Sequence, residues 1–333
     1  MNIAINGFGR IGRSVFRILN GKENVNIVAI NDIFDKEALT YLLKYDTVMG
    51  RFPEEVHLKG DTLNTKSQKV KLLAENNPEA LPWGDLAVDI VVESTGIFRK
   101  RAQLDKHLTA GAKRVVLTVP SKDEIDYTVV LGVNDHGLNS EHKIISNASC
   151  TTNCLAPMAK VLNDAFGIEI GIINTIHAYT NDQRLADVPH SDWRRSRAAA
   201  ENVIPTTTGA ARAVGKVLPE LNGKLDGIAM RVPVPDGSVV DFNVRLKCDV
   251  SSDDVNYVVK EASESDFLGR VLHYSTLPVV STDIIGNPHS SIFDAPFTRV
   301  IKGNFVKTLN WYDNEWGYAN RVVDLLHILD ALD

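Results

Sequence analysis

The stretch "NIAINGFGRIGR", residues 2–13, decides the fold of the first half of the chain. It opens with an apolar run, Asn2–Asn6, that predicts a strand. Three glycines follow in the pattern G-x-G-x-x-G, namely Gly7, Gly9 and Gly12. Glycine-rich turns are common, so the surrounding sequence has to decide whether this one binds a phosphate.

The surroundings predict a strand–turn–helix–strand unit. Residues Arg10–Leu19 have helical periodicity, and Asn26–Asn31 is a second apolar run of strand length. Asp32 ends that run, twenty positions after Gly12. An acidic residue at this point completes the fingerprint of a dinucleotide-binding Rossmann fold, because it can reach a ribose of the ligand.

Each residue of the fingerprint has a physical role. Gly7 permits a tight turn, Gly9 lets a pyrophosphate approach the backbone, and Gly12 lets the helix and strand pack closely. The helix N-terminus faces the phosphate charge. Asp32 accepts hydrogen bonds from a ribose hydroxyl and repels a 2′-phosphate, which favours NAD over NADP.

The rest of the first half alternates β-branched runs with helical segments, as in a parallel sheet covered on both faces. The predicted elements are strands at Val88–Ser94, Arg114–Val119, Tyr127–Val133 and Lys143–Ser146, and a helix at Arg99–Ala110.

The second half predicts an α+β arrangement with a largely antiparallel sheet. Longer strands are expected at Gly171–Tyr179, Leu225–Val234, Ser238–Cys248 and Asn304–Tyr312, with a turn at Val232–Ser238. Helices are expected at Ser252–Ser263, which begins with a capping sequence, and at Asn314–Leu332.

Length and composition exclude several classes of protein. A chain of 333 residues is long enough for about two domains. A net charge of −6 and a pI near 5.9 argue against a nucleic-acid partner. No apolar run reaches the ~18 residues of a membrane span, and the N-terminus does not resemble a signal peptide. Three cysteines fit a reducing compartment, so we expect a cytoplasmic protein.

The loop "SNASCTTNC", residues 146–154, contains two of the three cysteines. The spacing of Cys150 and Cys154 matches neither a zinc site nor a redox pair, so no metal site is expected. A helix is predicted from Cys150 onward, with Ser149 and Thr151 supplying cap hydroxyls. A helix N-terminus lowers a thiol pKa, which suits a nucleophile, but a buried structural cysteine is equally compatible with this loop alone.

Other residues supply the groups that such a nucleophile needs. His177 ends an apolar strand and can project from a rigid element as a base. Arg231 interrupts another apolar strand, where an unpaired arginine is costly unless an anion binds it. The threonines of Pro205–Arg212 predict a phosphate nest or a helix cap. The long polar segment Thr180–Arg197 is typical of a functional loop or a subunit contact.

Taken together, these motifs closely resemble the phosphorylating glyceraldehyde-3-phosphate dehydrogenases over essentially the whole chain. The matching stretches are "INGFGRIGR", "LLKYDTVMGRF", "VVESTG", "SNASCTTNCLAP", "HAYTNDQ", "PTTTGAA", "RVPVPDGS" and "WYDNEWGY".

The resemblance implies an α/β chain with an N-terminal Rossmann NAD-binding domain, residues 1–149 and 314–333. It also implies a catalytic α+β domain with a mostly antiparallel mixed sheet, residues 150–313. Members of the family are usually homotetramers, and the segment Thr180–Arg197 resembles their S-loop, which lies against a neighbouring subunit's cofactor.

Residue roles follow from the resemblance. Cys150 would be the nucleophile and His177 its base. The implied NAD contacts beyond the fingerprint glycines and Asp32 are Arg10, Ile11, Thr95, Gly96, Thr118 and Asn314, the last meeting the nicotinamide amide. The implied site for attacking inorganic phosphate is Ser149, Thr151, Thr208 and Gly209. The implied site for the substrate's own phosphate is Thr180 and Arg231, with Arg195 nearby.

The implied reaction oxidises glyceraldehyde 3-phosphate to 1,3-bisphosphoglycerate through a hemithioacetal and a thioester on Cys150. Erythrose-4-phosphate dehydrogenase has the same fold and nucleophile and is the nearest alternative. A cysteine hydrolase and a catalytically idle NAD-binding protein are alternatives from other classes; the Rossmann fingerprint counts against the hydrolase.

Overall fold

The computed structural model describes residues 1–332. The chain forms two compact units, which are described separately. The first comprises Met1–Val129, Gly137–Ala148 and the segment from Ala319 onward, and the second comprises Val130–His136 and Ser149–Tyr318. The domain limits expected from the sequence stay a prediction.

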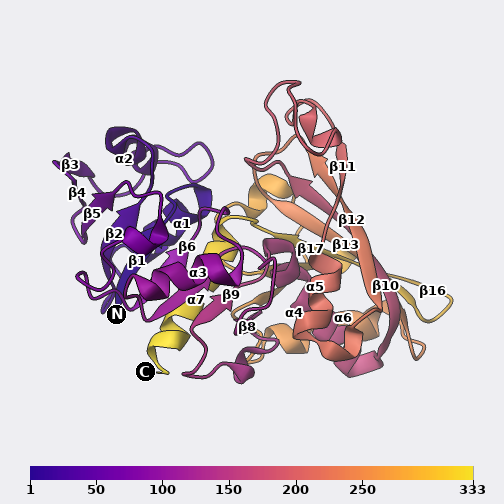
Figure 1. Ribbon diagram of the computed structural model, residues 1–333. Coiled ribbons are helices and arrows are strands. Elements are labelled where there is room, and N and C mark those ends of the chain that lie inside the picture. Colours follow the sequence, from indigo (N-terminus) through magenta and orange to yellow (C-terminus); the bar gives the residue numbers. More distant parts are fainter. Residues whose placement is uncertain (333) are drawn as a thin grey trace. The chain divides into compact units, whose positions relative to one another are not determined.

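The first unit is built on a nine-stranded sheet in the order β3-β4-β5-β2-β1-β6-β7-β9-β8 (Figure 1). Its strands are β1 (Asn2–Asn6), β2 (Asn26–Asn31), β3 (His57–Lys59), β4 (Thr62–Asn64), β5 (Lys69–Leu73), β6 (Ile90–Glu93), β7 (Arg114–Leu117), β8 (Tyr127–Thr128) and β9 (Ile144–Ser146). In the sheet order β5-β2-β1-β6-β7-β9-β8, every neighbouring pair of strands is parallel. The order β5-β2-β1-β6-β7-β9 is that of a Rossmann fold, so the predicted fold class is confirmed here.

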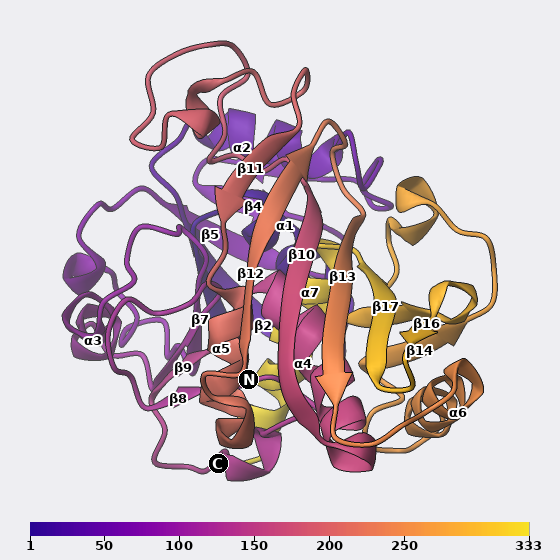
Figure 2. The same cartoon turned by 90° about the vertical axis from the view of Figure 1, so that its right-hand side faces the viewer.

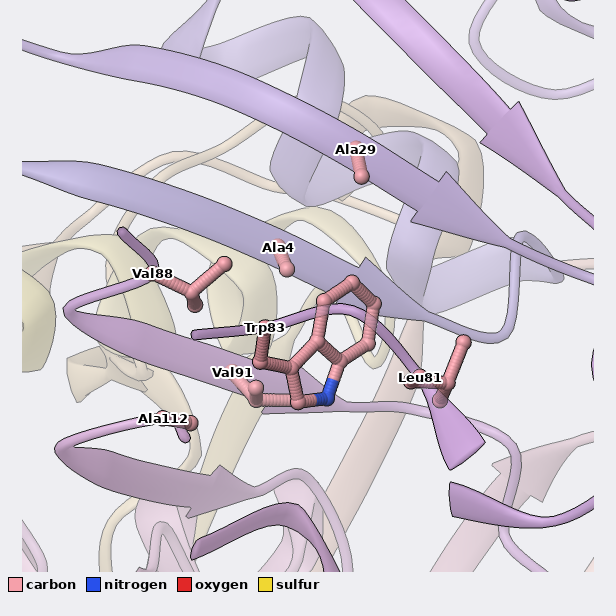
Figure 3. Packing of buried hydrophobic residues seen from close by; sticks show 7 residues of the cluster. All are labelled: Ala4, Ala29, Leu81, Trp83, Val88, Val91 and Ala112. Carbon is pink, nitrogen blue, oxygen red and sulfur yellow. The ribbon is translucent and has the colours of Figure 1, made fainter. Parts of the chain in front are cut away.

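The helices that belong wholly to this unit are α1 (Arg10–Leu19), α2 (Lys36–Lys44) and α3 (Arg101–Thr109). A buried tryptophan fills one face of the sheet: the ring of Trp83 lies against β1, β2 and β6 (Figure 3). Ala4 and Ala29 leave room for the indole, because larger side chains at those two positions would occupy its space. The indole thus packs on the strands β1 and β2 that flank the glycine turn in the sequence.

The second unit is built on an eight-stranded sheet, whose broad face is visible in Figure 2. Its strands are β10 (Ile168–Ala178), β11 (Ile204–Thr207), β12 (Leu225–Val232), β13 (Ser238–Leu246), β14 (Leu272–Ser275), β15 (Ser291–Asp294), β16 (Arg299–Ile301) and β17 (Phe305–Tyr312). Only the pairs β10–β12 and β14–β15 are parallel. The sheet is therefore mixed and mostly antiparallel, as expected.

Three helices belong wholly to this unit: α4 (Cys150–Phe166), α5 (Ala210–Val217) and α6 (Ser252–Ser263). A further helix, α7 (Trp316–Asp330), begins after β17 and belongs to the first unit from Ala319 onward. Among residues 1–332, no helix is long and apolar enough to cross a membrane.

Most predicted elements occur within a few residues of their expected limits, but one strand is largely wrong. The run Tyr127–Val133 is a strand only over its first two residues. The N–H of Val130 donates to the side chain of Asn134, and Gly132 has a φ of +77°, so the backbone turns away from the sheet. The apolar residues there are buried in a turn, which periodicity cannot distinguish from a short strand.

Candidate functional site

The glycine turn after β1 requires glycine at two of its three positions. A Cβ on Gly7, whose φ is +93°, would lie 2.6 Å from the N of Thr95. A Cβ on Gly12 would lie 2.1 Å from the carbonyl oxygen of Gly7. A Cβ on Gly9 would meet nothing within 4 Å. Two glycines therefore serve the packing of strand and helix, and the third borders open space in which a diphosphate can approach the backbone.

The N-terminus of α1 is free for an anion. Gly9 is its N-cap, and within residues 1–332 no side chain caps the helix and its first turn holds no acidic residue. The guanidinium of Arg10 is already paired with Asp46. The predicted contacts of Arg10 and Ile11 with the cofactor would therefore use their main-chain groups, as helix N-termini do.

Asp32 follows β2 directly and is tied to the glycine turn. Its Oδ2 accepts a hydrogen bond of 2.7 Å from the N–H of Phe8, and its Oδ1 accepts one of 3.1 Å from Phe34. The carboxylate is partly exposed. It is thus fixed beside the turn while keeping acceptor capacity for a hydroxyl group.

The other expected cofactor residues of this unit lie around buried Glu93. The carboxylate of Glu93 accepts a hydrogen bond of 2.9 Å from the N–H of Thr95. The hydroxyl of Thr118 donates to the carbonyl oxygen of Glu93 at 3.1 Å and is buried. The hydroxyl of Thr118 is therefore already occupied by a hydrogen bond to the neighbouring strand. Gly96 has a φ of +71° and open space at its Cβ position.

The second unit contains the candidate nucleophile. Cys150 is the first residue of α4, and the hydroxyl of Ser149 caps the helix by accepting the N–H of Thr152 at 3.0 Å. The side chain of Cys150 is partly exposed, whereas Cys154, one turn further, is fully buried. The hydroxyl of Thr151 does not cap the helix, so that part of the prediction is wrong.

His177 lies near the end of β10, buried, with its Nε2 3.5 Å from the Sγ of Cys150. Burial, followed by the charge of Arg231, lowers the pKa of His177 to about 3. The imidazole is therefore neutral at physiological pH and can accept a proton.

The tautomer of His177 decides which role Nε2 can take. Nδ1 lies 2.7 Å from the carbonyl oxygen of Ala178 and 2.9 Å from Nη1 of Arg231, and it cannot serve as donor and acceptor at once. When the proton is on Nδ1, Nδ1–H donates a hydrogen bond to the carbonyl oxygen of Ala178, and the lone pair of Nε2 faces the thiol. Arg231 keeps acceptors of its own in this state, because Nη1 also lies 3.2 Å from Ala178 O and from the hydroxyl of Thr180. This is the tautomer in which His177 is a base.

Burial raises the pKa of the Cys150 thiol, and Arg231 opposes that effect. The net effect is a raised thiol pKa, whereas the helix N-terminus was expected to lower it. Desolvation of a partly enclosed thiolate outweighs the favourable charges here. A neighbouring base is therefore required to take the thiol proton, and His177 is in position to do so.

Arg231 lies on β12, beside His177 in the parallel register of β10 and β12. Its Nε is buried and, within the described chain, has no hydrogen-bond partner. An unsatisfied guanidinium nitrogen is costly unless an acceptor binds it. The observation favours an anion at this position.

Thr180 and Arg195, both expected near the substrate's phosphate, converge on a residue that the sequence did not single out. The carboxylate of Asp182 accepts hydrogen bonds from the hydroxyl of Thr180 and from Nη1 of Arg195. Arg231 contacts the same hydroxyl. The carboxylate of Asp182 thus binds Thr180 and Arg195, two of the residues that were predicted to bind the substrate's phosphate.

The residues expected to bind inorganic phosphate fall into two groups. In the first, the hydroxyl of Thr151 is buried and lies 2.8 Å from that of Tyr312, which also meets Thr175 at 2.9 Å. In the second, Gly209 is the N-cap of α5, and the hydroxyl of Thr208 accepts the N–H of Ala210 at 3.2 Å. Whether the two groups, with Ser149, share one phosphate stays a prediction.

Asn314 is buried just before α7. Its Oδ1 accepts a hydrogen bond of 2.6 Å from the hydroxyl of Ser238, which in turn accepts the N–H of Ala178 at 3.0 Å. The amide is therefore oriented, and its Nδ2 has no partner among residues 1–332. A fixed amide with a free donor suits an acceptor on a ligand.

Two family models match most of the chain. One, described as the NAD binding domain of glyceraldehyde 3-phosphate dehydrogenase, matches residues 1–101, and one for the C-terminal domain of that enzyme matches residues 149–314. The chain belongs to the glyceraldehyde-3-phosphate dehydrogenase family.

Named relatives agree with this membership. A glyceraldehyde-3-phosphate dehydrogenase of Borreliella burgdorferi is 55% identical over 331 residues, covering 98% of both chains. One of Priestia megaterium is 54% identical over 332 residues, covering 99% of this chain and 98% of the relative. The matches run through both units, so the family resemblance seen in the motifs is confirmed.

The structure of this glyceraldehyde-3-phosphate dehydrogenase family member also shows site residues that were not predicted from the sequence. Asp182, Ser238, Tyr312 and Glu93 were not among the residues predicted for the site. All four lie inside the motifs that carry the family resemblance, which was the only available signal. Among residues 1–332, no group of three or more His, Cys, Asp or Glu side chains could hold a metal ion.

Proposed function

We propose that this chain is an NAD-dependent phosphorylating dehydrogenase that converts glyceraldehyde 3-phosphate and inorganic phosphate to 1,3-bisphosphoglycerate. The carrying observation is the placement of the Cys150 thiol at the start of α4, 3.5 Å from a neutral, buried imidazole. Family membership and the names of the relatives support the substrate and the cofactor.

His177 starts the reaction. Nε2 takes the proton of the Cys150 thiol, and the thiolate adds to the aldehyde carbon to form a hemithioacetal. Arg231 stabilises the thiolate, because its charge opposes the rise in the thiol pKa that burial causes. The N-terminus of α4 adds partial positive charge near the resulting oxyanion.

The first unit has the features that NAD requires. Open space at Gly9, the uncapped start of α1 and the fixed carboxylate of Asp32 fit a diphosphate and a ribose. Main-chain groups of Arg10 and Ile11 would hold the diphosphate, with Thr95, Gly96 and Thr118 at the ends of the neighbouring strands. Asn314 of the second unit would donate Nδ2 to the nicotinamide amide. When bound, NAD accepts the hydride that leaves the substrate carbon.

Two anion sites complete the proposal. Thr180, Arg231 and Arg195 would bind the phosphate of the substrate, supported by the unsatisfied Nε of Arg231. Ser149, Thr151, Thr208 and Gly209 would bind the phosphate that attacks the thioester, with Thr151 contributing through its main chain because its hydroxyl meets Tyr312. Attack on the thioester carbon releases the acyl phosphate and restores the thiolate.

The decisive experiment is NAD reduction with glyceraldehyde 3-phosphate in the presence and absence of inorganic phosphate. We expect multiple turnovers only with phosphate, and loss of activity in Cys150→Ser. Cys154→Ser is the matched control, because Cys154 is buried away from the reacting thiol. Phosphate-independent turnover would contradict the phosphorylating assignment, and full activity of Cys150→Ser would contradict the nucleophile.

Erythrose 4-phosphate is the competing substrate. A ratio of kcat/KM for the two aldehydes that favours glyceraldehyde 3-phosphate is expected, in keeping with the names of the relatives. A ratio that favours the longer sugar would assign the chain to the alternative.

We also propose a cytoplasmic homotetramer. All three cysteines are free thiols, as fits a reducing compartment. Leu185 and Trp193 on the segment Thr180–Arg197 are 86% and 88% exposed, which suits a subunit contact. The molar mass in solution tests the assembly; a monomer would contradict it.

A further inference from the structure

The turn between β12 and β13 holds a buried carboxyl group without a hydrogen-bond donor for one of its oxygens. Asp236 is wholly buried. Its Oδ1 accepts the N–H of Gly237 at 2.8 Å, whereas its Oδ2 has no partner within the described part of the chain. A buried carboxylate in this state would be strongly destabilised, but a protonated Oδ2 can donate instead of accept.

The acceptor for such a proton is Asp313. This carboxyl is also buried, and a side-chain interaction joins it to Asp236. Its Oδ1 accepts the N–H groups of Glu315 and Trp316 at 2.8 and 2.6 Å, and its Oδ2 accepts that of Gly286 at 2.7 Å. Both oxygens of Asp313 thus already accept N–H donors, so the proton between the two carboxyls is placed on Oδ2 of Asp236.

The electrostatics point in the same direction. Burial first, then the charges of Asp313 and Glu315, raise the pKa of Asp236 to about 9. A carboxyl with this pKa is protonated at neutral pH. The pair therefore carries one proton and one negative charge, like other carboxyl pairs that cannot both ionise.

The two carboxyls join the segments that orient Asn314. Asp236 is two residues before Ser238, whose hydroxyl bonds Asn314, and Asp313 directly precedes Asn314. The turn is tightly packed: Gly237 has a φ of +82°, and a Cβ there would lie 2.1 Å from the carbonyl oxygen of Ser281. A change in the separation of the carboxyls would therefore be transmitted to the bond between Ser238 and Asn314.

We propose that Asp236 is a positioning residue: its protonated carboxyl donates to Asp313, and this hydrogen bond, called the clamp below, holds the Asn314 amide in the orientation that binds the nicotinamide. The second part rests on the proposed function. Loss of the proton leaves two facing carboxylates, which repel each other and loosen the clamp.

The charges with the largest effect on Asp236 are both anionic. Glu315, on the same side as Asp313, adds negative charge. Asp283 of the 3-10 helix Ser281–Ile284 is exposed and accepts the N–H of Val280. The charge of Asp236 acts on Cys150 of α4 by raising its thiol pKa. Asp313 and Glu315 thus both disfavour an ionised Asp236.

The first test measures stability without cofactor. Asp236→Asn is a neutral isostere of the protonated acid. Wild type takes up a proton on folding between the unfolded and folded pKa of Asp236, so its stability falls as the pH rises toward about 9. The Tm of the variant relative to wild type should rise steadily from pH 6 to pH 9, with the ratio of folding equilibrium constants changing about tenfold per pH unit.

The matched control is Asp266→Asn, an exposed carboxyl of the same unit with no described partner. Its Tm difference from wild type should not depend on pH. A pH-independent difference for Asp236→Asn would overturn the protonated state of Asp236. If that variant does not fold, infrared spectroscopy of wild type decides instead: a protonated carboxyl band should be present at pH 7 and lost as the pH passes about 9. Absence of the band would overturn the proposal.

The second test measures the affinity for NAD by quenching of tryptophan fluorescence. The Kd of wild type should rise several-fold relative to that of Asp236→Asn between pH 8 and pH 10. A pH-independent ratio, with NAD bound by both proteins, would overturn the clamp alone. Absence of NAD binding by both proteins at every pH would overturn the proposed function itself.

Discussion

Nη1 of Arg231 lies 2.9 Å from Nδ1 of His177, and this one cation acts on both members of the thiol–imidazole pair. After burial, it is the largest cause of the lowered pKa of His177. For Cys150 it is the largest opposing effect to the rise in pKa that burial causes. A residue expected to bind the substrate's phosphate therefore also stabilises the Cys150 thiolate and keeps the His177 imidazole neutral.

Replacing Arg231 by Gln should slow the alkylation of Cys150 by iodoacetamide at neutral pH, because the thiol pKa rises further. About a tenfold loss per pKa unit is expected, together with a higher KM for the phosphorylated aldehyde. Arg212→Gln, on the exposed face of α5, is the control and should match wild type. An alkylation profile unchanged from wild type in Arg231→Gln would show that the cation does not act on the thiol.

His177 should make the protein sensitive to acid. The folded pKa of about 3 lies below the unfolded value, so the unfolded chain binds the extra proton between pH 6.5 and pH 3. Stability therefore rises with pH across this window and is lost as the pH falls, by up to about 1.4 kcal/mol per pH unit.

The variant His177→Gln should lose this dependence while kcat falls about 10²–10⁴-fold. Urea unfolding at several pH values, compared with wild type, measures the difference. His57→Gln, an exposed histidine, is the control and should leave the acid dependence intact. An equal acid dependence in His177→Gln and wild type would show that His177 titrates normally in the folded protein.

Sequence patterns predicted what depends on neighbours along the chain. The turn around Gly7 and the start of a helix at Cys150 follow from local spacing, and both occur where expected. Partners brought together by the sheet could not be predicted. Tyr312 meets Thr151 across 161 positions, and periodicity carries no information about such pairs.

The direction of the Cys150 pKa shows the same limit. A helix N-terminus is visible in the sequence, but the burial that outweighs it depends on how the strands of the second sheet, β10 and β17 among them, pack against α4. Likewise, the pairing of Arg195 with Asp182 depends on a loop whose conformation has no periodic signal.

Ser238→Ala should weaken cofactor binding without removing the nucleophile. The hydroxyl holds Oδ1 of Asn314 at 2.6 Å, and without it the amide can rotate and its Nδ2 is no longer directed. A loss of about 1 kcal/mol, or roughly a fivefold higher Kd for NAD, is expected. The rate of Cys150 alkylation without cofactor should not change. An unaltered Kd would contradict the orienting role of Ser238.

The glycine turn offers a paired test of packing against binding. Gly12→Ala places a Cβ 2.1 Å from the carbonyl oxygen of Gly7, so strand and helix must separate. We expect a loss of about 1–3 kcal/mol in stability and, as a consequence, weaker NAD binding. Gly9→Ala meets no atom within 4 Å and has a φ of −73°, which alanine adopts, so its Tm should stay close to that of wild type.

The affinity of Gly9→Ala for NAD should nevertheless fall, because the added methyl group occupies the space through which a diphosphate approaches the backbone. Thermal unfolding without cofactor and fluorescence titration with NAD separate the two effects. A normal affinity in Gly9→Ala would show that the diphosphate does not pass over this turn. An unchanged Tm in Gly12→Ala would show instead that the close contact between α1 and β1 can relax.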